Sequence, residues 1–454
     1  MSAVATLARI WLAISMACML HARTLVVGPG GQFADVREAV RAAVSADTIE
    51  VHSGTYQGNL ILDKPVALDG TGWPVLQGDG TGSVITVMAA GCSIRGFRIE
   101  HSGGMLVDED SGILLKSDGN RIEHNQLRDV LFGIYFYQSS HNTATGNSLY
   151  GRKELGFGER GAGIHIWNSA DNTIEQNTIT DMRDGMYLQN ADRSVIRGNR
   201  VFGVRYGLHY MYSNDNIFED NTFENNVAGA AIMYSHNIQF RRNAFIHNRG
   251  FSSFGVLFQD SQNCVSEQNL FVDNVVGIFM EALRDSRFER NLIASNDTAI
   301  QVFSSSERND FIRNNFAANL SPISIVGKTS NIRWDRDGTG NYWSDYKGYD
   351  LDGNGIGDVP FRIQNLFEHL EGNRPRLRIY FFSPASQALA AAEQSFPIIE
   401  GTHEFDRYPL MKPVDVQMKI PVGLNARDGS AALAAVPVSM FLIAAVVMWR
   451  GRKR

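Results

Sequence analysis

Three side chains with soft donor atoms lie at related places in the middle of this 454-residue sequence. His209 and Met211 are two residues apart, and Met233 follows Met211 by 22 residues. An imidazole with two thioethers suits Cu(I) and is a poor ligand set for magnesium or calcium. If the fold brings the three together, they predict a transient Cu(I) site. They could instead pad a protein–protein interface, where Met is an adaptable side chain, and geometry alone favours this interface over the metal site. The two functions are compatible.

A repeat of about 22 residues supplies the elements that would position these side chains. An Asn followed two residues later by a hydrophobic residue returns at Asn125, Asn147, Asn177, Asn199, Asn221, Asn243, Asn269, Asn291 and Asn314. A second Asn series follows five residues behind the later members of the first, at Asn226, Asn248, Asn274, Asn296 and Asn319. A fixed period of this size indicates stacked supersecondary units. Asn side chains that stack at equivalent turns hydrogen-bond along the stack, so we expect both series to be structural.

The repeat has the periodicity of strands. After each Asn comes a Gly followed by residues that alternate in hydrophobicity, as in Gly207-Leu208-His209-Tyr210. Alternation with period two places successive side chains on opposite faces of a strand. Short strands of this kind bury their apolar face only when each coil stacks on the next. The sequence therefore predicts an all-β fold, a parallel β-helix, right-handed by analogy with parallel crossovers.

This fold would bring residues of successive coils side by side. Residues two and four positions after the Gly point outward, so His209 and Met211 lie roughly 7 Å apart along one strand and Met233 about 4.8 Å away on the next coil. The outward positions are rich in aromatic, His and Met residues, whereas a solvated face would be polar. Such an apolar band indicates a partner. We expect the partner surface to include Tyr135, His165, Trp167, Tyr187 and Phe279.

The two ends of the chain carry membrane-related signals. Residues 1–22 have a positive start, an apolar stretch and a plausible cleavage site, which is typical of a secretory signal peptide. Residues 431–449 form an apolar run long enough to span a bilayer, and the basic residues 450–454 would then be cytoplasmic. Residues 414–430 would be the linker. The sequence thus predicts a periplasmic body that is anchored to the inner membrane by a C-terminal helix.

The body between these signals divides into three parts. We predict an N-terminal cap helix near residues 35–44 with early coils over 23–100, regular coils over 101–340, and an irregular C-terminal cap with a partner-binding segment over 341–413. Extra residues at 150–161 and 249–254 interrupt the period. Insertions in a solenoid form loops, often on the binding side.

An Asp/Gly-rich stretch in the C-terminal cap has the spacing of an EF-hand-like calcium loop. Asp350, Asp352, Asn354 and Asp358 occupy its first, third, fifth and ninth positions. Phe361 stands at the twelfth position, where such loops carry a bidentate Glu. Structural Ca2+ and a plain turn are therefore both consistent with this stretch.

Composition narrows the function classes further. The net charge is -6, and no basic stripe with interleaved aromatic residues is present, so we expect no nucleic-acid partner. Cys92 and Cys264 lie about seven coils apart, roughly 30 Å at the ladder spacing. A disulfide requires Cα atoms within about 7 Å. The two residues are therefore expected to be buried thiols.

The rival class is a polysaccharide lyase or epimerase, or a polysaccharide-binding protein, because many parallel β-helices act on such polymers. Lyase chemistry needs a base beside carboxylates or calcium. The outward positions hold one carboxylate, Glu281, while Arg183, Asp184 and Arg205 equally suit ion pairs at the coil edge. A purely structural surface protein is a third possibility. We therefore expect no catalytic residues.

Several longer phrases resemble the NosD family, periplasmic maturation proteins for nitrous oxide reductase. They are RDGMYLQNA, RYGLHYMYSN, GAAIMYSHN, GNYWSDYKGYDLDGNGIGDVPF and SPASQALAAAEQSFPII, and the likeness extends over about residues 24–413. The resemblance implies a β-helix bound to the membrane subunits of an ABC transporter. It also implies cooperation with a copper chaperone lipoprotein that delivers copper to the apo nitrous oxide reductase.

Overall fold

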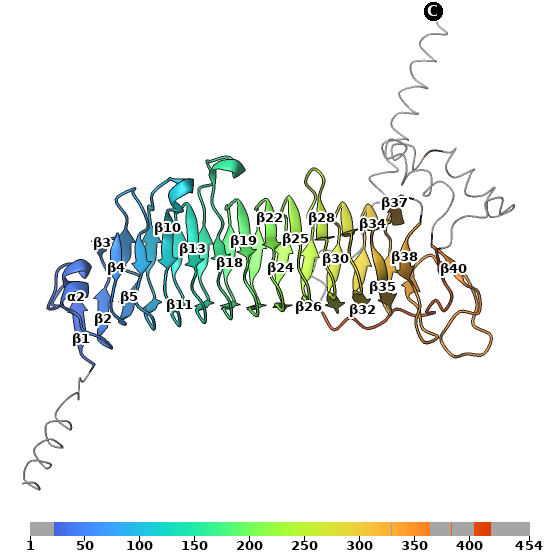
Figure 1. The fold of residues 1–454 in the computed structure, drawn as a ribbon, viewed down its shortest axis with the longest axis horizontal. Coiled ribbons are helices and arrows are strands. Elements are labelled where there is room, and N and C mark those ends of the chain that lie inside the picture. The colour runs from blue at the N-terminus through green and yellow to red at the C-terminus, as the bar shows by residue number, and fades with distance from the viewer. Residues whose placement is uncertain (1–21, 328, 364–382, 384–403, 419–454) are drawn as a thin grey trace, which may run out of the picture. The chain divides into compact units, whose positions relative to one another are not determined.

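The computed structural model describes residues 22–327, 329–363, 383 and 404–418. Stacked coils make up its body (Figure 1), and they pass through three parallel sheets of 14, 13 and 12 strands, which we call sheets A, B and C. One coil consists of β20 (Val195–Arg197) in A, β21 (Arg200–Phe202) in B and β22 (Tyr206–Met211) in C; the next consists of β23 (Ile217–Glu219), β24 (Thr222–Glu224) and β25 (Ala228–Met233). The predicted all-β parallel solenoid is confirmed.

Sheet C carries the Gly-led repeats, and it is the sheet that matters for function. In chain order its strands are β4 (Leu60–Leu62), β7 (Ile85–Val87), β10 (Ser111–Leu115), β13 (Phe132–Tyr137), β16 (Ile164–Trp167), β19 (Asp184–Gln189), β22, β25, β28 (Phe254–Gln259), β31 (Val276–Glu281), β34 (Thr298–Phe303) and β37 (Ser321–Val326). Each pairs with the next in parallel. The inward residues, such as Leu208 and Tyr210, are fully buried.

The core changes character along the stack. The N-terminal coils are filled by aliphatic side chains such as Ile94 and Ile122, whereas later coils stack Phe upon Phe. The ring centroids of Phe288 and Phe311, for example, are 4.3 Å apart with nearly parallel planes. Identical positions one coil apart face each other, and aromatic pairs contribute about 0.5–1.5 kcal/mol beyond burial. Cys92 and Cys264 are buried and free, as predicted.

Both predicted Asn series form hydrogen-bonded ladders. At the turn between sheets A and B, the backbone N–H of Asn199 donates to Oδ1 of Asn221 over 3.0 Å, and its amide donates to the same atom and to the Ile174 carbonyl. At the turn between B and C, Asn248 donates to Asn274 in the same way. These buried amides satisfy backbone groups that the tight turns leave unpaired. A third, less regular ladder between C and A was not predicted; Asn120, Asn142 and Asn172 belong to it.

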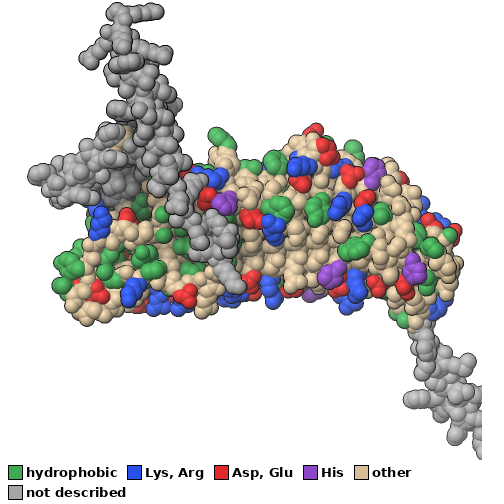
Figure 2. All heavy atoms as spheres, turned by 180° about the vertical axis from the view of Figure 1, so that it is seen from behind, with side chains coloured by type: hydrophobic (Ala, Val, Ile, Leu, Met, Phe, Trp, Pro, Cys, Tyr) green, Lys and Arg blue, Asp and Glu red, His purple; other side chains and the backbone are tan. Residues whose placement is uncertain are grey.

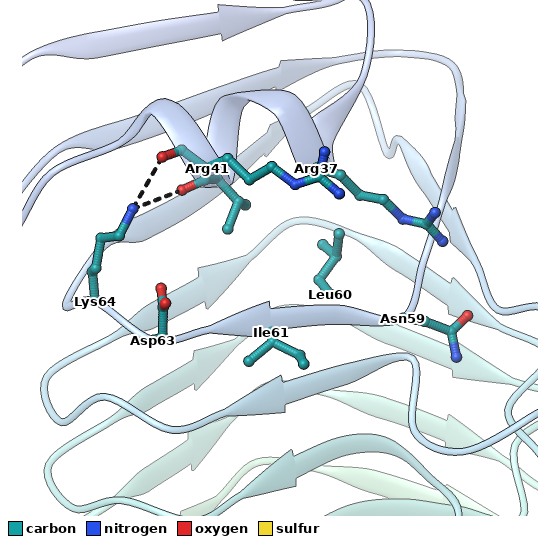
Figure 3. A pocket seen from close by; sticks show the side chains of 8 residues that line it. Arg37, Arg41, Asn59, Leu60, Ile61, Asp63 and Lys64 are labelled. Atoms are coloured by element: carbon teal, nitrogen blue, oxygen red, sulfur yellow. Dashed lines mark hydrogen bonds between the residues drawn. The ribbon is translucent and has the colours of Figure 1, made fainter.

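A short helix closes the first coil. Helix α2 (Val36–Ala42) forms where the sequence predicts a helix, and it is capped by Asp35, whose carboxylate accepts the Arg37 N–H. A hollow of about 340 Å3 separates α2 from β4 (Figure 3). Lys64 lines it and donates to the carbonyls of Arg41 and Ala43 at the end of the helix. Because a cation at a helix C-terminus is stabilising, this lysine has a structural role.

The other end of the stack is closed by a segment that returns from later in the chain. Strand β40 (Phe361–Arg362) pairs in antiparallel fashion with β41 (Phe405–Asp406). Asp406 is buried and accepts the Asn341 N–H and the Trp343 indole N–H, so a carboxylate terminates the first Asn ladder. Burial raises the pKa of Asp406 to about 6, although these hydrogen bonds act in the opposite direction.

The Asp/Gly-rich stretch forms a self-bonded turn. Asp350 accepts the backbone N–H groups of Gly353 and Gly355, and Asp358 accepts that of Leu351. Asn354 donates to Asp352. These hydrogen bonds account for the Asp/Gly composition without a metal, and the calcium interpretation stays a prediction.

Three loops rise from one edge of the stack, where sheet B meets sheet C (Figure 1). They contain the 3-10 helices η1 (Leu106–Asp108) and η2 (Phe157–Glu159), and the tip near Phe251. The predicted insertions at 150–161 and 249–254 thus share one side; the loop of η1 was not predicted. Arg152 ties the first two loops together by donating to Asp129 and to the Ser102 carbonyl.

The membrane-related predictions fall largely on other parts of the chain. Among the residues that the structure describes, no helix is long and apolar enough to cross a membrane. The predicted helix at 431–449, the basic tail at 450–454 and all but the last residue of the 1–22 signal lie outside the described residues. These expectations stay predictions.

Candidate metal and partner-binding site

The outward face of sheet C brings the predicted soft donors onto neighbouring strands. Met211 of β22 is directly opposite Met233 of β25 in the ladder, and His209 lies two residues before Met211 on the same strand. All three side chains are partly exposed. Adjacent strands are about 4.8 Å apart, so thioethers and imidazole of this length can reach a common ion.

His209 is held by two aromatic rings and one carboxylate. Its ring meets Tyr187 edge-on at 4.8 Å and lies 5.2 Å from the ring of Tyr206. Its Nδ1 is 3.2 Å from Oδ2 of Asp184, and the His209 side chain is 15% exposed. The imidazole is therefore anchored on one side and open on another.

Asp184 is the centre of a buried charge cluster. Its carboxylate, which is fully buried, accepts two hydrogen bonds from Arg205, at 2.9 and 2.7 Å, and lies 3.5 Å from Nε of Arg183. Burial alone would raise the pKa of Asp184, but the hydrogen bonds from His209 and Arg205 outweigh burial and lower it. The cluster carries two guanidinium groups and one carboxylate, and neutral soft donors beside excess positive charge favour a monovalent over a divalent ion.

His165 occupies the same position in the repeat two coils earlier, in different surroundings. Its ring stacks on Tyr135 at 4.3 Å and meets Tyr187 at 4.7 Å. Both ring nitrogens are buried without a hydrogen-bond partner among the described residues. Burial lowers the pKa of His165 to about 3. Tyr187 stands between His165 and His209 in the ladder, so the two imidazoles do not share one site.

The predicted partner surface is only partly available. Trp167 stacks on Tyr137 at 5.0 Å and stays half-buried, as do Tyr187 and Phe279. Tyr135 is 1% exposed, so its assignment to a contact surface is corrected. Its hydroxyl forms a hydrogen bond with the side chain of Glu109, on the η1 loop. The repeat pattern did not predict this contact.

Two aromatic residues beside the methionines were also missed. Tyr212 and Tyr234 directly follow Met211 and Met233, and their rings stack at 5.0 Å while staying 49% and 42% exposed. Both adopt the left-handed backbone region, with φ of 49° and 53°, where the preceding two coils place Asn. This conformation costs roughly 1–2 kcal/mol for a residue of this type. Because the same left-handed turn recurs in the following coils, at Asp260 and Ala282, the conformation belongs to the repeat, and the exposed stacked rings are the feature that points to a binding role.

The signal for Asp184 was present in the sequence. On β19 the residue shares the parity of the buried Met186 and Leu188, which marks it as a buried Asp that must be paired, but its contacts with His209 and Arg205 place its carboxylate on the outward side of sheet C. Its partners come from the next coil, which parity does not specify. Among the described residues no group of three or more His, Cys, Asp or Glu could hold a metal, so a metal site here depends on Met.

Comparisons with known proteins identify the family and the fold of this chain. The family described as "Periplasmic copper-binding protein (NosD)" matches residues 151–348. The "Probable ABC transporter binding protein NosD" of Pseudomonas aeruginosa is 35% identical over 380 residues, covering 79% of this chain and 87% of the relative. Its namesake from Stutzerimonas stutzeri is 32% identical over 374 residues, covering 79% and 86%.

This chain belongs to the NosD family. The family "Right handed beta helix region" matches residues 45–177 and confirms the predicted handedness. Two solved structures share the fold. The A-modules of the mannuronan C-5 epimerases AlgE6 and AlgE4 of Azotobacter vinelandii have TM-scores of 0.53 and 0.54 at 13% and 15% identity. They cover 68% and 66% of this NosD-family chain, which in turn covers 94% and 96% of theirs.

Proposed function

We propose that this protein is a periplasmic, non-catalytic accessory factor that receives or relays copper during the maturation of nitrous oxide reductase. It would work with the membrane subunits of an ABC transporter and with a copper chaperone lipoprotein. The observation that carries the proposal is the alignment of His209, Met211 and Met233 on one outward face of a chain whose family is described as copper-binding.

The donor chemistry supports this assignment. Two thioethers and one imidazole form a neutral, soft set that suits Cu(I). Partial exposure of all three side chains allows an ion to arrive and leave, as a relay requires.

The surroundings of the donors support docking of a protein partner. The stacked Tyr212 and Tyr234, with Met211 and Met233, form an exposed strip at the edge of sheet C. Tyr and Met are enriched at interface centres. Farther along the same face, Phe279 packs near Phe254 and Phe303. Charged side chains of both signs intermingle on the face that Figure 2 shows, which gives no support to a nucleic-acid partner.

A polysaccharide enzyme is less well supported. The buried carboxylate nearest to His209 belongs to Asp184, and Arg205 occupies both of its oxygens. A lyase or epimerase needs groups that are free to move protons at a sugar carbon. Unsaturated products released from uronic polymers by the purified protein would favour the enzyme instead.

The triple variant His209→Ala/Met211→Ala/Met233→Ala tests the proposal. In cells that depend on this protein, we expect a reductase that is severely copper-deficient, while the variant folds and is exported normally. A matched control removes the same residue types elsewhere, His101→Ala/Met88→Ala/Met105→Ala, where both methionines are exposed at 51% and 56%. Metal analysis of the purified reductase measures the effect. Normal copper loading by the first variant would reject the proposed site.

A further inference from the structure

The contact between His209 and Asp184 restricts the chemistry of the imidazole. Both oxygens of Asp184 already accept hydrogen bonds from the Arg205 guanidinium, so the group is a carboxylate in an ion pair and can only accept. The His209 Nδ1 lies 3.2 Å from Oδ2. Two acceptors cannot form a hydrogen bond, so Nδ1 must carry the hydrogen, and in the neutral ring Nε2 then carries the lone pair.

The surrounding groups keep this arrangement rigid. Asp184 is fully buried on β19, and its backbone is in register with that of Tyr206 on β22. The Arg205 guanidinium lies 4.6 Å from the Tyr206 ring, and Tyr206 in turn lies beside His209. Tyr187 meets the other side of the imidazole at a right angle. A rotation of the ring would break the Asp184 contact and disturb both aromatic contacts.

His165 occupies the equivalent position of the repeat, but no carboxylate among the described residues is hydrogen-bonded to its ring. Its backbone pairs with Tyr187, as that of His209 does, but its two nitrogens have no partner among the described residues. Nothing there selects one ring nitrogen as the ligand.

We infer that Asp184 is a positioning residue that fixes His209 as the Nδ1–H tautomer and leaves Nε2 as the nitrogen that binds the ion. The inference rests on the proposed function. Metal-bound histidines commonly donate their second N–H to a carboxylate, and loss of such a partner typically weakens metal binding 10–100-fold.

Two variants separate the orienting role from the ion pair. Asp184→Leu/Arg205→Leu removes the acceptor together with its main counter-charge, and so avoids an unpaired buried group. Arg205→Lys keeps Asp184 beside His209 and keeps a positive charge beside Asp184. Asp220→Leu/Arg242→Leu is the matched control, because it deletes another bidentate Asp–Arg pair, at 2.7 and 3.0 Å, which forms no hydrogen bond with the three donors in the described part of the chain.

Two measurements on the exported protein test whether Asp184 positions His209. With 15N-labelled histidine and His209→Gln for assignment, ring 15N shifts in the metal-free protein should show a protonated Nδ1 in the wild type and in Arg205→Lys, and its loss in the Asp184 double variant. Cu(I) affinity, from competition with a chromogenic chelator, should fall 10–100-fold in that double variant. It should stay within about threefold of wild type in Arg205→Lys and in the control.

The outcomes distinguish this inference from the function on which it rests. If the Asp184 double variant binds Cu(I) like wild type while the triple Ala variant has lost binding, the positioning role is overturned and the copper site stands. The inference also fails if Nε2 carries the hydrogen in the wild type. Wild-type Cu(I) affinity in the triple Ala variant would overturn the copper site and the inference together.

Discussion

His165 and His209 occupy the same position of the repeat two coils apart, yet they differ in almost every physical property. His165 is enclosed by rings, its nitrogens have no partner among the described residues, and its pKa falls to about 3. His209 keeps an open side and is tied to a buried carboxylate. The repeat determines on which side of the sheet a residue lies, but the loop above it and the charges beside it determine what it can do.

The largest expected effect comes from breaking the charge cluster of the His209 region. Asp184→Ala leaves Arg205 without its carboxylate, and removal of one partner from a buried pair costs about 3–5 kcal/mol. Because Arg205 is 35% exposed, we expect about 3 kcal/mol, measured as the free energy of unfolding in urea. Asp220→Ala, in an exposed pair, should cost less than about 1 kcal/mol. Equal losses of unfolding free energy in Asp184→Ala and Asp220→Ala would contradict the distinction between the buried and the exposed pair.

The pH dependence of stability should reveal the contribution of the buried His165 imidazole. With its pKa lowered to about 3, folded His165 binds fewer protons than the unfolded chain, whose His has a pKa near 6.5. The stability that this shift contributes is present above pH 6.5 and is lost as the pH falls toward 3. Between pH 7 and pH 5 it should amount to about 2 kcal/mol. His165→Leu should remove that part of the acid sensitivity, as thermal unfolding at several pH values would show; an unchanged pH profile would refute it.

The smallest effect is expected for the same substitution at neutral pH. His165→Leu removes two buried nitrogens that lack partners and supplies a side chain of similar volume, so the stability at pH 7 should change by less than about 1.5 kcal/mol. Copper loading of the reductase should stay normal, in contrast to a His209→Leu variant. A defect of equal size in both would mean that the two histidines act together.

Much of the site could be predicted because the repeat has a fixed length, which sets the residues that become neighbours on successive coils. Met211 and Met233 are 22 residues apart, one coil of a parallel ladder, and therefore had to become neighbours once the strand parity was known. The Asn ladders follow from the same rule. Tyr135 was wrongly assigned to the surface because parity gives direction and not burial, and the η1 loop that covers it comes from the preceding coil.

The sequence by itself determined the coil period, the inward and outward faces, and the soft donors that share one face, because these depend on spacing along a single strand direction. The tertiary structure alone decided that Asp184 would face His209 and that Arg205 would neutralise it, since this depends on side-chain packing between coils. It also decided that residues from beyond position 403 would return to end the Asn ladder at Asp406. The reason is that a solenoid's backbone register repeats locally, whereas its charges and caps are completed by residues that the repeat does not encode.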